Sequence, residues 1–308
     1  MNNVIRMLQF ESVSKKYRHT KFWSLKDVSL KAENGKVSGL IGLNGAGKTT
    51  AIKIAASLIE QTEGDIICDN LSLSNDKDYI RNIGTVLDSD SFDPVQTAYN
   101  QLSYYCGLYG LSKKEQRDKS SELLKTVGLY DNRNRRLSAY SHGMKKRFMI
   151  ASALINDPST LLFDETFNGL DPDGCRYLKA FIKDSVKKGK SILISSHSLT
   201  ELAEIADKIY VLHKGEIVRI LEHSDFIGNK PNGLRIMIDP IDDRAVRLIR
   251  EFGETSADGN EAVLLNSDIN EETVARIRKI LEKNGYKILD IRKNFKKLEE
   301  IFFEIISL

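Results

Sequence analysis

The chain has 308 residues, of which 41% are hydrophobic and 29% charged, and its 46 basic and 43 acidic residues give a formal net charge of +3. This composition is typical of soluble globular proteins and argues against a disordered, collagen-like or coiled-coil chain; so small a charge, despite the basic run at 132–136, predicts no nucleic-acid partner. No apolar run approaches the ~18 residues of a membrane helix, and residues 1–10 lack the apolar core of a secretory signal, so we expect a chain that neither crosses a membrane nor is exported.

Short apolar runs alternate with helical segments through the first two thirds of the chain. Extended runs are expected at 8–13 and 25–31, with a polar loop at 14–21 between them. Later runs of four or five apolar residues are typical of buried strands, and segments with helical periodicity lie between most of them. These runs are 37–41, 83–87, 160–163, 191–194 and 209–212. The alternation predicts an α/β fold with a mostly parallel sheet covered on both faces.

A helical insertion interrupts this pattern. No strand-like run occurs between 94 and 157, and helices are predicted at 98–109, 113–127 and 143–156. We therefore expect a helical subdomain at about 92–157 within an α/β body.

A cluster of turn-forming residues at 224–233 marks a predicted domain boundary, which divides the chain into residues 1–224 and 225–308. The second part is expected to be a small α+β domain. Its predicted strands are 234–238, 262–265 and 288–291, and its predicted helices are 242–252, 271–284 and 295–306.

Three cysteines, Cys68, Cys106 and Cys175, are widely separated along the chain. Their spacing predicts neither a disulfide framework nor a zinc site. We expect isolated thiols in a reducing cytosol.

A phosphate-binding pattern, G-x-x-x-x-G-K-[ST], follows the predicted strand 37–41 and opens a predicted helix at 49–58. Glycines allow the backbone N–H groups to approach phosphate oxygens closely, and the helix N-terminus adds its dipole. Lys48 would bridge the β- and γ-phosphates, and the Thr49 hydroxyl would bind Mg²⁺. The expected nucleotide-binding residues are Gly42, Leu43, Asn44, Gly45, Ala46, Gly47, Lys48, Thr49 and Thr50. The pattern predicts binding of a nucleoside triphosphate with Mg²⁺.

The predicted strand 160–163 ends in two carboxylates, Asp164 and Glu165. Successive side chains of a strand point to opposite faces, so the two residues are expected to have different tasks. Hydrolysis of a triphosphate requires one carboxylate near the metal and one that accepts a proton from the attacking water. We assign Asp164 to the metal and Glu165 to the general base.

Residues Ser141, His142, Gly143 and Met144 open another predicted helix. A serine hydroxyl and free N–H groups at a helix N-terminus form a second phosphate-binding surface. Taken alone, the serine is better explained as an ordinary helix cap.

The order of these motifs, followed by the sequence Ser195-Ser196-His197, resembles the nucleotide-binding subunit of ATP-binding-cassette (ABC) transporters over about residues 8–222. The resemblance implies a P-loop NTPase fold with an antiparallel β subdomain. It also implies two subunits that close head to tail, a homodimer being expected, so that Ser141, His142, Gly143 and Met144 contact the ATP bound to the partner subunit.

Further roles are implied by the same resemblance. Tyr17 would stack on adenine, His197 would contact the γ-phosphate and the attacking water, and Asp171, in the loop 168–171, would take part in communication between subunits. ATP and Mg²⁺ would be the substrate and cofactor. An integral membrane permease would be the partner, with this subunit bound peripherally at the inner face of the cell membrane.

Several residues depart from the family pattern. Asp88 stands where glutamine is usual; it can approach Mg²⁺ through water but adds a negative charge beside the triphosphate. His142 and Met144 occur where many members have glycine and glutamine, and Thr166 occurs where proline is common.

The serine helix start and the tail at 298–303 are similar to exporter ATPases for drugs, lipids, polysaccharides and peptide antibiotics, and they favour export. An alternative is a nucleotide-gated regulatory or resistance module with little turnover, which the retention of Lys48, Asp164, Glu165 and His197 disfavours. A non-transport ABC ATPase is disfavoured because there is neither a long coiled-coil insertion nor a second phosphate loop. Cargo is contacted by the permease, so this sequence does not identify it.

Overall fold

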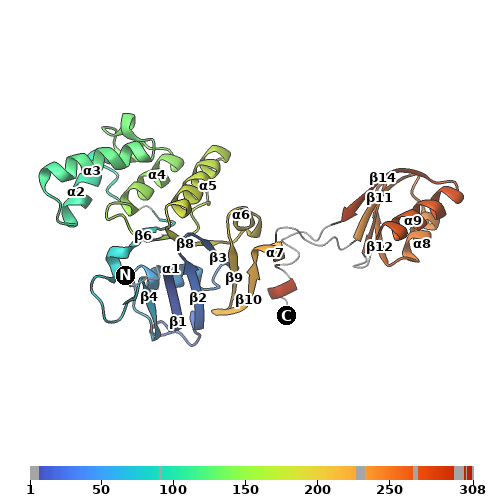
Figure 1. Cartoon of the computed structure of the whole chain (residues 1–308), viewed down its shortest axis with the longest axis horizontal. Helices are drawn as coiled ribbons and strands as arrows, with labels where there is room; N and C mark the ends of the chain where they lie inside the picture. The colour runs from blue at the N-terminus through green and yellow to red at the C-terminus, as the bar shows by residue number, and fades with distance from the viewer. Residues whose placement is uncertain are drawn as a thin grey trace. The chain divides into compact units, whose positions relative to one another are not determined.

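The computed structural model describes residues 7–89, 92–226, 233–265, 270–294, 302 and 304–306. The chain divides into two compact units between His223 and Ser224, one residue from the predicted boundary. Figure 1 shows the helices and strands of each unit. None of the described helices combines the length and apolarity needed to cross a membrane.

The first unit is built on a six-stranded sheet with the order β10-β9-β3-β8-β7-β6. All neighbouring strands in it are parallel except β9 and β10, which pair antiparallel. The strands are β3 (Val37–Ile41), β6 (Ile83–Val86), β7 (Thr160–Phe163), β8 (Ser191–Ser196), β9 (Lys208–His213) and β10 (Glu216–Glu222). The predicted mostly parallel sheet is therefore confirmed. Strand β10 was not predicted, because most of its side chains are exposed and it lacks an apolar run.

A second, antiparallel sheet of the same unit has the order β2-β1-β4-β5. Its strands are β1 (Met7–Lys15), β2 (Leu25–Glu33), β4 (Glu63–Cys68) and β5 (Leu71–Ser72). Strands β4 and β5 were missed, since β4 buries only Ile66 and Cys68 and β5 has two residues. The two sheets share one core, to which helix α1 (Lys48–Ala55) contributes Ile52 and Ile54.

Helices fill the chain between β6 and β7, as predicted (Figure 1). They are α2 (Ala98–Leu108), α3 (Lys113–Thr126) and α4 (His142–Ala153), with short 3₁₀ turns at Tyr130–Asn132 and Leu137–Ala139; a further 3₁₀ turn, Tyr79–Asn82, precedes β6. Polar side chains fix the starts: Thr97 caps α2, and Ser112 forms a capping box with Glu115 at α3. Helix α5 (Pro172–Lys187) follows β7, and α6 (Leu199–Ala203) follows β8.

The second unit is a four-stranded antiparallel sheet with the order β12-β13-β11-β14 and two helices. In chain order it contains β11 (Gly233–Asp239), α8 (Asp243–Arg250), β12 (Glu254–Asp258), β13 (Glu261–Leu265), α9 (Glu271–Lys283) and β14 (Lys287–Asn294), after the short α7 (His223–Phe226). This β-α-β-β-α-β order is the ferredoxin-like arrangement. Strand β12 was not predicted, because Thr255 is its single buried residue. Most of the predicted helix 295–306 lies outside the described residues; 302 and 304–306 are helical.

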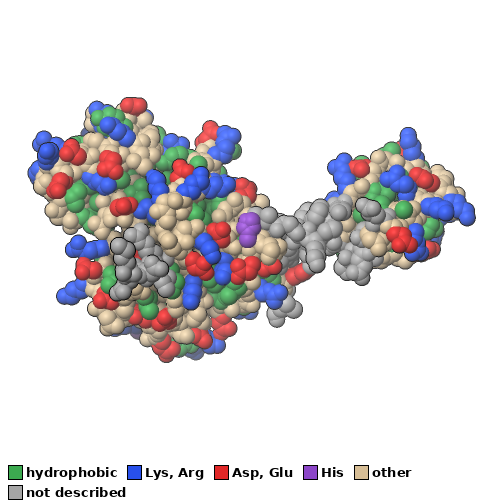
Figure 2. All heavy atoms as spheres, viewed as in Figure 1, with side chains coloured by type: hydrophobic (Ala, Val, Ile, Leu, Met, Phe, Trp, Pro, Cys, Tyr) green, Lys and Arg blue, Asp and Glu red, His purple; other side chains and the backbone are tan. Residues whose placement is uncertain are grey.

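Figure 2 shows Lys and Arg side chains intermixed with Asp and Glu on the visible face of each unit. In the basic run at 132–136, Arg135 and Arg136 are exposed. Cys68, Cys106 and Cys175 are free thiols, the first two buried.

Candidate nucleotide-binding site

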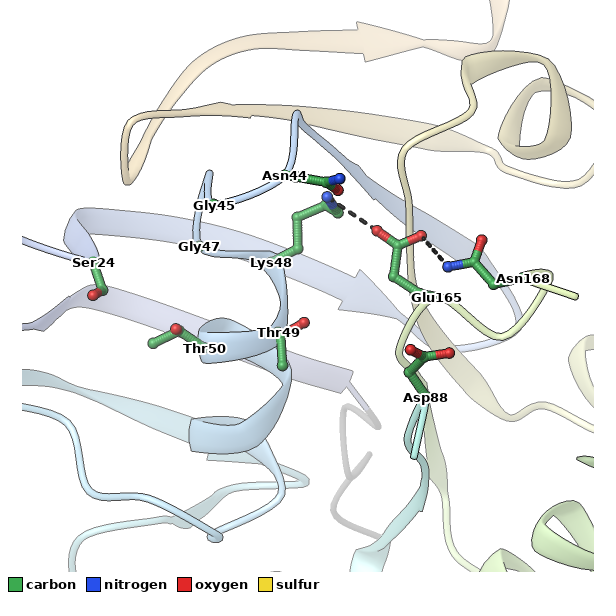
Figure 3. Close-up of a pocket in the computed structure, with 10 residues that line it drawn as sticks. All are labelled: Ser24, Asn44, Gly45, Gly47, Lys48, Thr49, Thr50, Asp88, Glu165 and Asn168. Atoms are coloured by element: carbon green, nitrogen blue, oxygen red, sulfur yellow. Dashed lines mark hydrogen bonds and ion pairs between the residues drawn. The ribbon is translucent and has the colours of Figure 1, made fainter. Parts of the chain in front are cut away.

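The glycine loop lies between β3 and α1 and lines a cavity of about 430 Å³. A Cβ atom at Gly42 would lie 2.4 Å from the carbonyl oxygen of Leu212, and one at Gly47 would lie 2.4 Å from that of Ser24. Gly47 also has a φ of 112°, so only glycine fits there without strain. The cavity is lined by Ser24, Asn44, Gly45, Gly47, Lys48, Thr49, Thr50, Asp88, Glu165 and Asn168 (Figure 3).

Lys48 is buried at the start of α1, and its side chain points toward Glu165 (Figure 3). Its Nζ donates to the carbonyl oxygens of Gly42, at 2.7 Å, and Leu43, at 3.3 Å, and lies 3.0 Å from Glu165 Oε1. The amine is therefore fixed inside the glycine loop with a carboxylate as its counter-ion.

Thr49 and Asp164 form the second contact between the loop and the end of β7. The Thr49 hydroxyl donates to Asp164 Oδ1 at 3.2 Å, and Asp164 is only 2% exposed. Burial raises the pKa of Asp164, against the hydrogen bonds from Ser195 and Thr49 that lower it. A hydroxyl and a carboxylate this close suit Mg²⁺, which prefers oxygen ligands and uses one or two carboxylates together with substrate phosphates. Among the described residues, no group of three or more His, Cys, Asp or Glu side chains could hold a metal by itself.

Glu165 follows Asp164 with its backbone in the left-handed region, at a φ of 46°. For a side chain of this size the conformation costs about 1–3 kcal/mol. Its Oε2 accepts a hydrogen bond from His197 Nδ1 at 2.9 Å and a longer one from Asn168 Nδ2 at 3.5 Å. Burial alone would raise the pKa of Glu165, but the contacts with His197 and Lys48 outweigh it and hold the pKa below its ordinary value. Glu165 is therefore ionised at neutral pH, which is the state in which a carboxylate can act as a general base.

Three further predicted residues, Tyr17, Ser141 and Asp171, are not among those that line this cavity. The Tyr17 hydroxyl is 3.4 Å from Thr50 Oγ1, and Tyr17 is 39% exposed. Ser141 caps α4, where its Oγ accepts from the N–H of Met144 at 3.3 Å. Asp171 caps α5 by accepting from the N–H of Gly174 at 2.7 Å. Ser141 and Asp171 thus both cap helices, in addition to the roles that the resemblance implies for them.

The serine helix start is nonetheless joined to the acidic end of β7. His142 Nε2 lies 3.1 Å from the carbonyl oxygen of Asn168, so the ring nitrogen is the donor. Asn168 in turn contacts Glu165 through its side chain. The sequence placed Asn168 in the loop 168–171 that the resemblance links to communication between subunits; its contact with His142, 26 positions away along the chain, depends on the fold.

Asp88 lies just beyond β6 and lines the cavity. Its Oδ1 is 3.6 Å from Nζ of Lys146, a buried lysine of α4, which also donates to the Asp88 carbonyl oxygen at 3.2 Å. The sequence predicts an added negative charge beside the triphosphate; the structure places a cation against it. Lys146 was not identified from the sequence, since a single lysine in a basic helix gives no signal of burial.

The Asp88→Gln variant is expected to bind ATP about two- to fivefold more tightly at low ionic strength, because it removes one negative charge near the triphosphate. The gain should shrink as salt is added. Nucleotide titration at two salt concentrations measures this, with Asp131→Asn as a control for loss of an exposed charge. Equal affinity of variant and parent at low salt would mean that Lys146 already offsets Asp88 completely.

Comparison with known proteins identifies the family of the chain. A family model described as ABC transporter matches residues 25–168. The bacitracin transport ATP-binding protein BcrA of Enterococcus faecalis is 32% identical over 308 residues, which cover 98% of this chain and 96% of that protein. The chain belongs to the family of ABC transporter ATP-binding proteins. Another relative of this ABC ATPase, the lantibiotic transport ATP-binding protein SrtF of Streptococcus pyogenes, is 36% identical over 212 residues, 69% of this chain and 89% of that protein.

Solved structures share the fold of most of this chain. A dimeric ATP-binding cassette in a post-hydrolysis state, bound to ADP and Pi, is 26% identical with a TM-score of 0.64, and the match covers 70% of this chain and 98% of that one. The predicted P-loop NTPase fold and ATPase class of this ABC ATPase are confirmed.

Proposed function

We propose that this ABC ATPase is a Mg²⁺-dependent subunit that hydrolyses ATP to drive a separate membrane permease in the export of drug, peptide or lipid-like cargo. It would bind peripherally at the cytoplasmic face of the membrane. The observation that carries the proposal is the ionised Glu165, which lies in one cavity with the glycine loop and is held there by Lys48 and His197.

The chain's own residues divide the reaction among them. The backbone amides of the glycine loop and the Lys48 amine would bind the phosphates, while Tyr17, beside Thr50, would pack against the base. Thr49 and Asp164 would hold Mg²⁺, whose charge neutralises the phosphate oxygens when it is bound. Glu165 would accept the proton of the attacking water. His197 would orient the Glu165 carboxylate and the water.

A second subunit is needed to complete the site. Ser141 and Gly143 lie at a helix N-terminus outside the cavity of their own chain, and a helix N-terminus favours an anion. We expect these residues to contact ATP bound to the partner subunit, with Asp171 near the subunit boundary. The dimeric relative supports this arrangement, and a homodimer is the simplest form of it.

The permease would dock on the helical insertion. Helix α2 carries exposed apolar side chains, with Tyr104 62% and Leu108 68% exposed, and Tyr109 follows at 47%. A cluster of exposed large apolar side chains of this kind is typical of a protein interface. The names of the relatives, which refer to transport of bacitracin and of a lantibiotic, favour peptide antibiotics as the cargo class.

We expect affinity purification of the tagged chain from native membranes to recover a polytopic membrane protein. The Leu108→Asp variant should lose that partner while keeping its ATP turnover. Docking would bury the aspartate charge without a counter-ion, which is energetically costly. Leu58→Asp, at an exposed leucine outside the helical insertion, is the matched control. Recovery of ribosomes or DNA in place of a membrane protein would contradict the proposal.

A further inference from the structure

Ser195 is a fully buried serine near the end of β8, with 0% of its surface exposed. Its hydroxyl contacts both residues at the end of β7. It donates to Asp164 Oδ1 at 2.7 Å and accepts from the backbone N–H of Glu165 at 3.0 Å. One hydroxyl offers one proton and two lone pairs, so both bonds form at the same time.

The two bonds act on different parts of consecutive residues. At Asp164 the serine fixes the carboxylate, while at Glu165 it fixes the backbone. The Glu165 backbone is in the left-handed region, which a side chain of this size rarely adopts unless its surroundings impose it. The bond to the Glu165 N–H is a constraint of this kind.

We propose that Ser195 is a positioning residue that sets the Glu165 carboxylate and the Asp164 carboxylate for hydrolysis, without touching ATP itself. The inference rests on the proposed function, because it assigns Asp164 to the metal and Glu165 to the base. Without the hydroxyl, the partly buried N–H of Glu165 loses its acceptor and the backbone is free to leave the left-handed region. The Glu165 side chain then loses its alignment with Lys48 and His197.

The same strand provides a matched control. Ser191 begins β8 and is also 0% exposed, yet its hydroxyl has no hydrogen-bond partner among the described residues. Ser191→Ala therefore removes the same atoms from the same buried strand without breaking a bond. Any difference between the two alanine variants reports the bonds of Ser195.

The test measures kcat and KM for ATP, with melting temperatures, in the full chain. Ser195→Ala is expected to lower kcat about 10- to 100-fold, the range found when a group that orients a functional ligand is removed. KM should stay within about threefold, because the glycine loop that binds the phosphates is untouched. The kcat of Ser195→Cys, which keeps a weak donor, should lie between those of Ser195→Ala and the parent. The kcat of Ser191→Ala should match that of the parent within about twofold.

Parental kcat in Ser195→Ala would overturn the inference, as would an equal loss in Ser191→Ala. A rise in KM that accounts for the whole effect would also overturn it, since it would indicate a binding role. If Ser195→Ala does not fold, parental kcat in Ser195→Cys decides against the inference and a reduced kcat at unchanged KM decides for it. Failure of the proposed function is distinguishable: Glu165→Gln would then turn over ATP at the parental rate, whatever Ser195 does.

Discussion

We expect the Glu165→Gln variant to bind ATP with parental affinity but to hydrolyse it about 10²–10⁴-fold more slowly. This factor is the usual contribution of a positioned general base. The amide keeps the size of the side chain and still accepts a hydrogen bond from His197. It does not take up a proton from the attacking water. The contacts with His197 and Lys48 hold the pKa of Glu165 below its ordinary value, against the effect of burial, so the parental group is a carboxylate at neutral pH.

Steady-state phosphate release and nucleotide titration separate turnover from binding in this variant. Glu60→Gln, at an exposed glutamate, controls for the loss of a carboxylate. Phosphate release at the parental rate would show that another group is the base. A parallel loss of ATP affinity would show that the charge of Glu165 serves binding through Lys48.

The Lys48→Ala variant is expected to lose ATP binding, with an affinity at least about 100-fold lower. Its ammonium is the cation held inside the glycine loop, 2.7 Å from the Gly42 carbonyl oxygen, and alanine offers the phosphates neither charge nor donor. The variant also leaves Glu165 without its 3.0 Å counter-ion, so an uncompensated carboxylate faces the incoming triphosphate.

Equilibrium titration with a fluorescent ATP analogue measures this loss. Lys53→Ala is the matched control, because it removes the same charge from the last turn of the same helix. Affinity within about threefold of the parent in Lys48→Ala would mean that the backbone amides bind the triphosphate without the lysine.

The glycine loop and the acidic end of β7 could be predicted because each is a short, continuous pattern. The positions of the buried strands along the chain were also predictable, since parallel strands covered on both faces are apolar along their whole length. Strands β4, β10 and β12 were not, because few of their side chains are buried and their identity depends on pairing with distant strands.

The contacts within the site were harder to predict from the sequence. Ser195 and Lys146 look like an ordinary strand serine and an ordinary basic helix residue, and only the fold brings them to Asp164 and Asp88. The left-handed backbone of Glu165 likewise depends on tertiary contacts. Helix ends also differed: α1 ends at Ala55 in place of 58, and α4 begins at His142 because Ser141 caps it.

The central claim is that ATP is enclosed between two subunits, which part after hydrolysis. Light scattering of the Glu165→Gln variant with Mg²⁺ and ATP tests it most directly, with ADP as the reference nucleotide. We predict the mass of two chains with ATP and of one chain with ADP. A single-chain mass at ATP concentrations that saturate binding would contradict the claim.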